Sequence, residues 1–93
     1  RIQILSNYPN PFNTKTLIPM KIANPSSPID VSIYNLKGQL VKSLFKGNAK
    51  SLGEYEWDGR DNSGSLVGSG VYFVRVQQGE YTAVRKLMRI RKL

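Results

Sequence analysis

Side chains able to carry out chemistry are few in this sequence, and their types limit what the protein can do. The 93 residues contain no histidine and no cysteine. This excludes a Ser-His-Asp or Cys-His nucleophile, a Cys/His zinc site and a disulfide framework. Paired-carboxylate catalysis is open to the six acidic residues, but without a histidine to assist. A chain of this length can bury one core but not a core and a deep active-site cleft. We therefore expect a binding or targeting module and not an enzyme.

The acidic loop after Trp57 has one feature of a calcium site. An EF-hand loop that began at Asp58 would need an oxygen ligand at its third position, where this sequence has Arg60. We expect Asp58 and Asp61 to accept backbone N–H groups inside the turn, with an exposed calcium site as the alternative. We expect no cofactor. Trp57 itself is expected in the core, and a sugar-stacking platform is its alternative role.

The run Asn-Tyr-Pro-Asn-Pro-Phe-Asn at residues 7–13 is stiff and rich in turn formers. Pro9 and Pro11 fix φ and remove two hydrogen-bond donors, so the segment cannot be an inner strand. Its asparagines can cap neighbouring backbone groups, and Phe12 is expected to anchor the segment to the core. Residues 1–13 are therefore expected to form an opening segment, which is either a rigid brace or a linear recognition motif.

The net charge of +8 is unevenly distributed along the chain. Residues 1–50 carry +6, residues 51–81 carry −3, and residues 82–93 carry +5 without an acidic residue. The basic end suits an anionic partner, and its alternative role is a solvated edge strand that deters aggregation. Aromatic residues with basic neighbours occur in single-strand nucleic-acid binders, but the RNP pattern is absent, so nucleic acid is not an expected partner.

The elements that must position these residues are strands and turns. Alternating or β-branched runs predict strands at 16–22, 29–36, 39–45, 52–57, 71–77 and 81–90. Pro19 inside the first of them suggests an edge strand or a bulge. Lys37 and Gly38 predict a tight two-residue turn. Six or seven short strands in one domain, residues 1–93, are typical of an all-β, immunoglobulin-like antiparallel β-sandwich.

Three blocks of the sequence, in order, resemble the C-terminal sorting domains of the type IX (Por) secretion system. They are residues 7–13, the run Ile-Tyr-Asn-Leu-Lys-Gly-Gln-Leu-Val at 33–41, and Gly-Val-Tyr-Phe-Val-Arg-Val at 70–76 followed by Arg-Lys-Leu at 85–87. The resemblance covers about residues 5–93. The loop Trp-Asp-Gly-Arg-Asp at 57–61 is also similar to the Ig-like domain of flagellar hook-capping proteins, which is related in fold.

The resemblance implies a targeting role. Members end large exported proteins and are read by the outer-membrane secretion machinery. In many of them a surface sortase removes the domain and joins the cargo to an anionic lipopolysaccharide. The expected partners are therefore that machinery, a sortase, lipopolysaccharide and an attached N-terminal cargo domain. The expected location is the periplasm in transit, then the cell surface or the medium.

The resemblance also implies which residues serve recognition. Arg89, Ile90, Arg91 and Lys92 are expected to form an outward recognition edge, while Gly38 and Gly70 are expected to enable turns. The complete set is Pro9, Asn10, Pro11, Phe12, Asn13, Gly38, Gln39, Gly70, Tyr72, Lys86, Leu87, Arg89, Arg91 and Lys92.

Two other functions are open from the sequence. An accessory carbohydrate-binding or cell-attachment Ig-like module of a secreted hydrolase would need two or three exposed, coplanar aromatic rings. A structural Ig-like spacer or assembly subunit would need none. The chain begins without a charged-then-apolar leader, so we expect it to be part of a longer protein.

Overall fold

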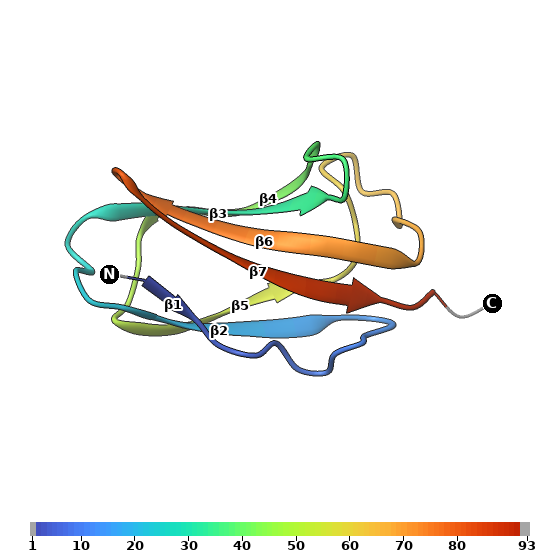
Figure 1. Cartoon of the computed structure of the whole chain (residues 1–93), viewed down its shortest axis with the longest axis horizontal. Coiled ribbons are helices and arrows are strands. Elements are labelled where there is room, and N and C mark those ends of the chain that lie inside the picture. Colours follow the sequence, from blue (N-terminus) through green and yellow to red (C-terminus); the bar gives the residue numbers. More distant parts are fainter. Residues whose placement is uncertain (1, 92–93) are drawn as a thin grey trace.

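Seven strands in two antiparallel sheets make up the fold of residues 2–91, the part of the chain that the computed structural model describes (Figure 1). The predicted all-β, immunoglobulin-like sandwich is confirmed. None of the described residues lies in a helix that could cross a membrane. The strands are β1 (Ile2–Ile4), β2 (Thr16–Ile22), β3 (Pro28–Asn35), β4 (Leu40–Asn48), β5 (Leu52–Trp57), β6 (Gly70–Gln78) and β7 (Tyr81–Arg89).

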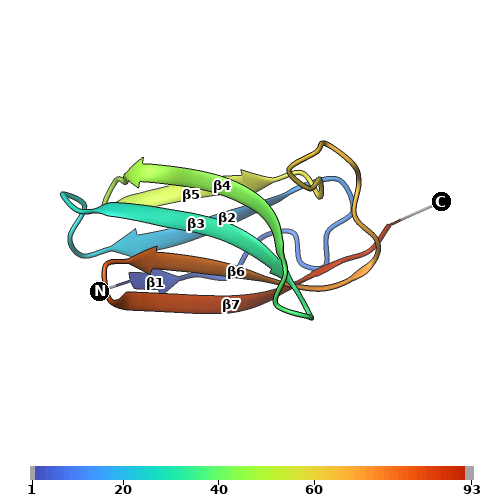
Figure 2. The same ribbon diagram turned by 90° about the horizontal axis from the view of Figure 1, so that it is seen from above.

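The two sheets face each other across one core in Figure 1, and in Figure 2, seen from above, one sheet overlies the other. One has the strand order β1-β2-β5 and the other β4-β3-β6-β7. Six of the strands lie where alternation of apolar and polar residues predicts them. The sequence does not predict β1, because its three residues are too few to show the alternation of apolar and polar residues that marks a strand.

The sequence places Pro19 on an edge strand or at a bulge, but β2 is the middle strand of its sheet. The proline is tolerated because β1 ends opposite Met20, where Ile4 is the last paired residue. The carbonyl of Pro19 accepts the N–H of Leu5 at 2.9 Å. The missing N–H of Pro19 lies on the same side of the strand, so its absence breaks no β1–β2 pair.

The turn between β3 and β4 is one residue longer than the predicted Lys37–Gly38 turn. The N–H of Gly38 donates to the carbonyl of Asn35 at 3.0 Å, and Gly38 itself has a φ of +82°. This is the three-residue hairpin in which a residue in the left-handed region completes the turn. The side chain of Asn35 caps it, since its Oδ1 accepts the N–H groups of Lys37 and Gln39.

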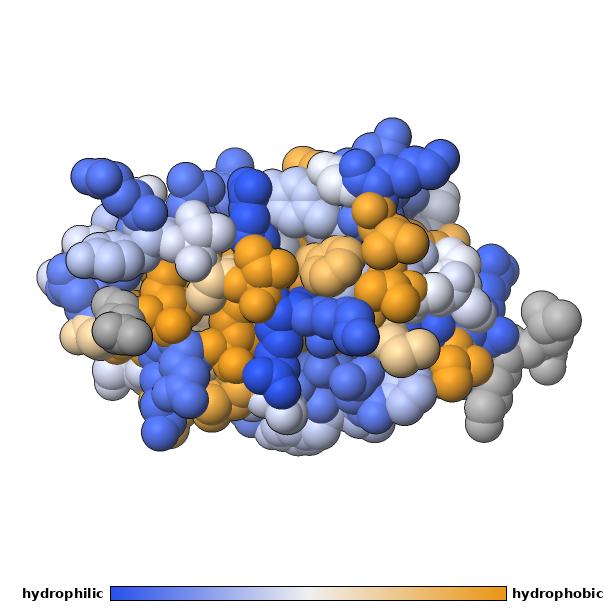
Figure 3. Space-filling view, in the orientation of Figure 1, coloured by the Kyte–Doolittle hydropathy of each residue, from blue (hydrophilic) through white to orange (hydrophobic). Residues whose placement is uncertain are grey.

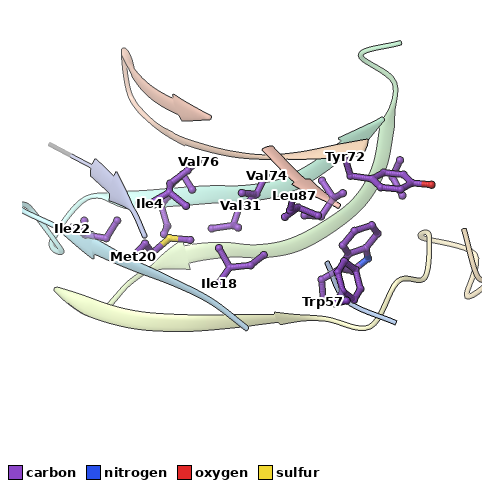
Figure 4. Packing of buried hydrophobic residues seen from close by; sticks show 14 residues of the cluster. Ile4, Ile18, Met20, Ile22, Val31, Trp57, Tyr72, Val74, Val76 and Leu87 are labelled. Carbon is purple, nitrogen blue, oxygen red and sulfur yellow. The ribbon is translucent and has the colours of Figure 1, made fainter. Parts of the chain in front are cut away.

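The core lies between the sheets and is built from alternate residues of each strand (Figure 4). At one end three aromatic rings meet. Trp57 is fully buried, and its ring lies 5.4 Å from that of Phe12 and 5.2 Å from that of Tyr72. Trp57 is therefore a core residue, as the sequence predicts, and it offers no surface on which a sugar could stack.

Candidate functional site

The opening segment lies along the last residues of β7, although the two are nearly 80 residues apart in sequence. Asn10 Oδ1 accepts the N–H of Met88 at 3.1 Å, and the N–H of Phe12 donates to the carbonyl of Met88 at 3.1 Å. The N–H of Ile90 then donates to the carbonyl of Phe12 at 2.8 Å. The opening segment therefore pairs with the end of β7 as a short parallel strand would.

Polar side chains beneath the opening segment fix its path. Asn7 is buried, and its Nδ2 donates to Thr16 Oγ1 at 3.0 Å. The hydroxyl of Thr16 donates in turn to the carbonyl of Pro9 at 2.9 Å. At the surface the hydroxyl of Tyr8 donates to the carboxylate of Glu54 on β5, and this bond raises the pKa of Tyr8. The capping role predicted for the asparagines of residues 7–13 agrees with these contacts of Asn7, but the sequence does not single out Thr16, whose signal is a polar residue at an inward strand position.

Arg89 does not face outward, contrary to the prediction for the recognition edge. Only 3% of its surface is exposed, because odd-numbered residues of β7 point into the sandwich. Its guanidinium lies 6.0 Å from the centre of the Phe12 ring, and Nη1 donates to the carbonyl of Val67 at 2.6 Å. Its Nε is buried and has no hydrogen-bond partner among the described residues.

Gly59 makes room for the buried arginine. A Cβ atom on Gly59 would lie 2.3 Å from Nε of Arg89 and 3.0 Å from its Cδ, and φ at Gly59 is +72°. Both the space and the backbone conformation therefore require glycine here. The glycine-rich loop, the opening segment and β7 all meet at Arg89.

The acidic loop is a set of capped turns, as predicted. Asp61 Oδ1 accepts the N–H groups of Ser63 and Ser65, each at 3.0 Å, and the hydroxyl of Ser63. These bonds, with that of the Ser63 hydroxyl the largest, lower the pKa of Asp61. Asp58 Oδ1 accepts the N–H of Arg60. Within residues 2–91 no three His, Cys, Asp or Glu side chains gather where a metal ion could bind.

The three blocks behind the family resemblance converge on one end of the sandwich, to the right in Figure 1. Phe12 of the opening segment forms an isolated β-bridge with Arg89 of β7, and Arg89 pairs with Gly70 of β6. Two residues along β6, Tyr72 pairs with Asn35, where the β3–β4 turn begins. We call this the motif end, defined by residues 10–12, 35–39, 70–72 and 87–90.

The predicted recognition residues, which lie in or next to the motif end, divide by burial. Phe12, Tyr72, Leu87 and Arg89 are buried, and the hydroxyl of Tyr72 donates to the carbonyl of Gly68. Gly70 is the first residue of β6, directly after a bend, and its φ of +151° favours glycine, so it shapes the entry to the strand. Lys92 lies outside the described residues. The exposed members are Pro9, Asn10, Pro11, Asn13, Gly38, Gln39, Lys86 and Arg91.

The surface beside the motif end mixes apolar and cationic side chains. Figure 3 shows hydrophobic side chains over β6 and β7, with hydrophilic ones between them. Val84 and Met88 are 56% and 41% exposed, and Lys86 lies between them on the outer face of β7. The three ion pairs found among the described residues are elsewhere and leave the cations of β7 without a carboxylate.

Known proteins share this fold. Residues 11–82 match the family model of the FlgD Ig-like domain. Dimeric latent PorU from Porphyromonas gingivalis contains a similar domain, with a TM-score of 0.77 and 22% identity over 98% of this chain and 9% of PorU. PorZ, a surface component of the type-IX secretion system of the same bacterium, gives a TM-score of 0.65 and 23% identity over 95% of this chain and 11% of PorZ.

The likeness to PorU and PorZ concerns the fold, since the chain spans about a tenth of the length of each. No curated protein sequence matches significantly. The match to the family model, in contrast, covers well over half of the 93 residues. The Ig-like sandwich, the glycine-rich loop after Trp57 and this match lead to one conclusion: the chain belongs to the FlgD Ig-like domain family.

Proposed function

We propose that the chain is a C-terminal sorting domain, which directs an attached cargo protein across the outer membrane through the type IX secretion machinery to the cell surface or the medium. It acts by being bound and not by catalysis. The fold is similar to domains of PorU and PorZ, and PorZ is described as an essential surface component of that system. The sequence blocks at 7–13, 33–41 and 70–76 point to the same system.

The observation that carries the proposal is the pairing of the opening segment with β7. Three hydrogen bonds join Asn10 and Phe12 to Met88 and Ile90. A linear signal would need no such contact, because its residues would be read from an extended chain. Here the blocks that resemble sorting domains lie side by side only in the folded molecule. We therefore propose that the machinery reads a folded surface at the motif end.

The geometry argues against the accessory carbohydrate-binding module. Such a module needs exposed coplanar rings, but Trp57 is fully buried and Tyr72 is 8% exposed. The half-buried rings of Phe45 and Tyr55 lie 5.2 Å apart at an interplanar angle of 46°, so they do not form a flat platform. The remaining exposed tyrosines, Tyr8 and Tyr81, lie on different strands or segments of the sandwich.

A secretion assay tests the proposal. A fluorescent reporter carries an N-terminal inner-membrane export signal and this chain at its C-terminus, in a bacterium with a working type IX system. We expect fluorescence at the surface or in the medium, and its loss when the translocon is inactivated. A reporter that stays in the periplasm, beside a known sorting domain that is exported normally, would refute the sorting role.

Point substitutions are better than truncation for mapping the signal. Removing residues 86–93 would take Leu87 out of the core, where it is 1% exposed, so failure to export would report unfolding. Asn10→Ala removes one bond to the N–H of Met88 and leaves the core intact. We expect it to reduce export, while Lys50→Ala, on a loop outside the motif end, leaves export unchanged.

A further inference from the structure

The free edge of β7 lies in its first half and not at its end. Backbone groups of alternate residues in a strand point to the same side. Met88 and Ile90 use the side away from β6 to bond Asn10 and Phe12. By the same alternation, the N–H and C=O groups of Thr82, Val84 and Lys86 also point away from β6.

Nothing in the described part of the chain occupies these groups. β7 is the last strand of its sheet, and Figure 2 shows no strand beyond it. The opening segment covers the edge only from Met88 onward. Further back, the side chain of Arg85 donates to the carbonyl of Ile4 on β1 and to the hydroxyl of Ser6 in the opening segment, and neither bond uses a backbone group of residues 82–86. Residues 82–86 thus present a row of unpaired donors and acceptors, which we call the open edge.

The charge around the open edge selects the partner. Arg85 and Lys86 belong to it and point to opposite faces of the sheet. The next cation, Arg75 on β6, is bonded to Tyr34 of β3 and lies on the other side of β7 from the edge. Residues 82–91 contain no acidic residue. A second copy of this chain would bring its own arginine and lysine against these cations, and like charges on adjacent strands are destabilising. A strand that carries carboxylates would instead meet Arg85 and Lys86, and its apolar side chains could cover Val84.

We propose that residues 82–86 are a docking edge for an extended, acidic segment of another protein, which adds to the four-stranded sheet as a fifth strand beside β7. Backbone pairing with Thr82, Val84 and Lys86 supplies the hydrogen bonds, and carboxylates facing Arg85 and Lys86 supply the selectivity. The inference rests on the proposed function and adds a partner to it. The acidic segment would belong to a protein that meets the chain during export.

A peptide titration tests the edge without reference to secretion. The probe is a ten-residue peptide that repeats Glu-Glu-Val-Val, so that carboxylates lie on both faces of the added strand, and its control carries lysine in place of glutamate. We expect the acidic peptide to slow hydrogen exchange at the amides of Thr82, Val84 and Lys86 about tenfold or more at saturation. The amides of Ala83 and Leu87, which face β6, should not change. Equal protection by the lysine peptide, or no protection at these three amides, would overturn the proposal.

Two variants locate the interaction. Val84→Pro removes an outward N–H that no β6 residue uses, and we expect it to weaken peptide binding about tenfold or more. Val84→Thr keeps the N–H and the shape, so its binding should match that of the parent. If Val84→Pro fails to fold by its thermal melt, Lys86→Glu replaces it. That variant reverses one charge at an exposed site and should lower binding of the acidic peptide while raising that of the lysine peptide.

Two further experiments, competition by an anionic polysaccharide and the export assay, distinguish the edge proposal from general binding of polyanions and from failure of the sorting role. If a sulphated oligosaccharide displaces the peptide and the peptide protects no edge amide, the basic residues bind polyanions in general and the edge proposal fails. In cells, export of the parent with loss of export for folded Val84→Pro supports the edge. Equal export of both overturns the edge and leaves the sorting role intact. If the parent is not exported, the sorting role fails and the peptide titration alone decides the edge.

Discussion

At the scale of single residues, Arg89 is where distant parts of the chain meet. Its guanidinium lies over Phe12, bonds to Val67 and fills the space beside Gly59. A buried arginine with one unpaired nitrogen costs free energy unless its surroundings fit closely. The fit depends on Gly59 having no side chain.

Gly59→Ala should lower the free energy of unfolding by about 3 kcal/mol. Alanine at a positive φ costs about 1–2 kcal/mol, and crowding in a packed core adds about 1–3 kcal/mol. Gly38→Ala is the matched control, since φ there is +82° but a Cβ would meet nothing within 4 Å. Gly38→Ala should therefore lower the free energy of unfolding only by the cost of alanine at a positive φ, about 1–2 kcal/mol. Urea melts of both variants test this, and equal losses would mean that Arg89 does not depend on Gly59.

Asp61 should make stability depend on pH in acid. Its pKa is lowered in the folded state by the Ser63 hydroxyl and by backbone N–H groups. Its contribution is therefore fully present above its unfolded pKa of about 4, and it is lost as the pH falls through the lower folded value. Asp61→Asn should show a smaller loss of stability between pH 5 and pH 2.5 than the parent in urea melts. Identical pH profiles would contradict the capping role.

At the scale of elements, β7 combines a covered half and an open half. Hydrogen exchange should resolve this directly. The amides of Met88 and Ile90 are bonded to the opening segment and should exchange slowly, whereas those of Thr82 and Val84 should exchange near the rate of an unfolded peptide. Comparable protection at Val84 and Met88 in the free chain would show that another part of the molecule covers the edge.

The strands themselves were largely predictable, because their signal is local. Alternation of apolar and polar residues located β2 to β7, and proline and glycine located the loops. The inward direction of Arg89 was not predictable, because charge alone suggests the surface and only the pairing of β7 with β6 sets the direction. The contact of Asn10 with Met88 joins residues 78 apart and has no local signal.

At the scale of the whole molecule, the sandwich separates its two ends. Its longest extent is 42 Å, and β1 begins at the end opposite to that where β7 stops (Figure 1). A cargo domain joined ahead of β1 would attach away from the motif end and would leave that end uncovered. This arrangement is compatible with the sorting role that we propose, in which a receptor binds the motif end.

The most direct test of a folded sorting signal is the export of two reporters measured together. One reporter ends in the whole chain, and the other ends in residues 81–93 alone, which contain β7 and the basic tail but neither the opening segment nor β6. The account predicts surface or medium fluorescence for the whole chain and retention in the periplasm for the short tail. Equal export of the two reporters would contradict it, because the signal would then be a linear basic peptide that needs no fold.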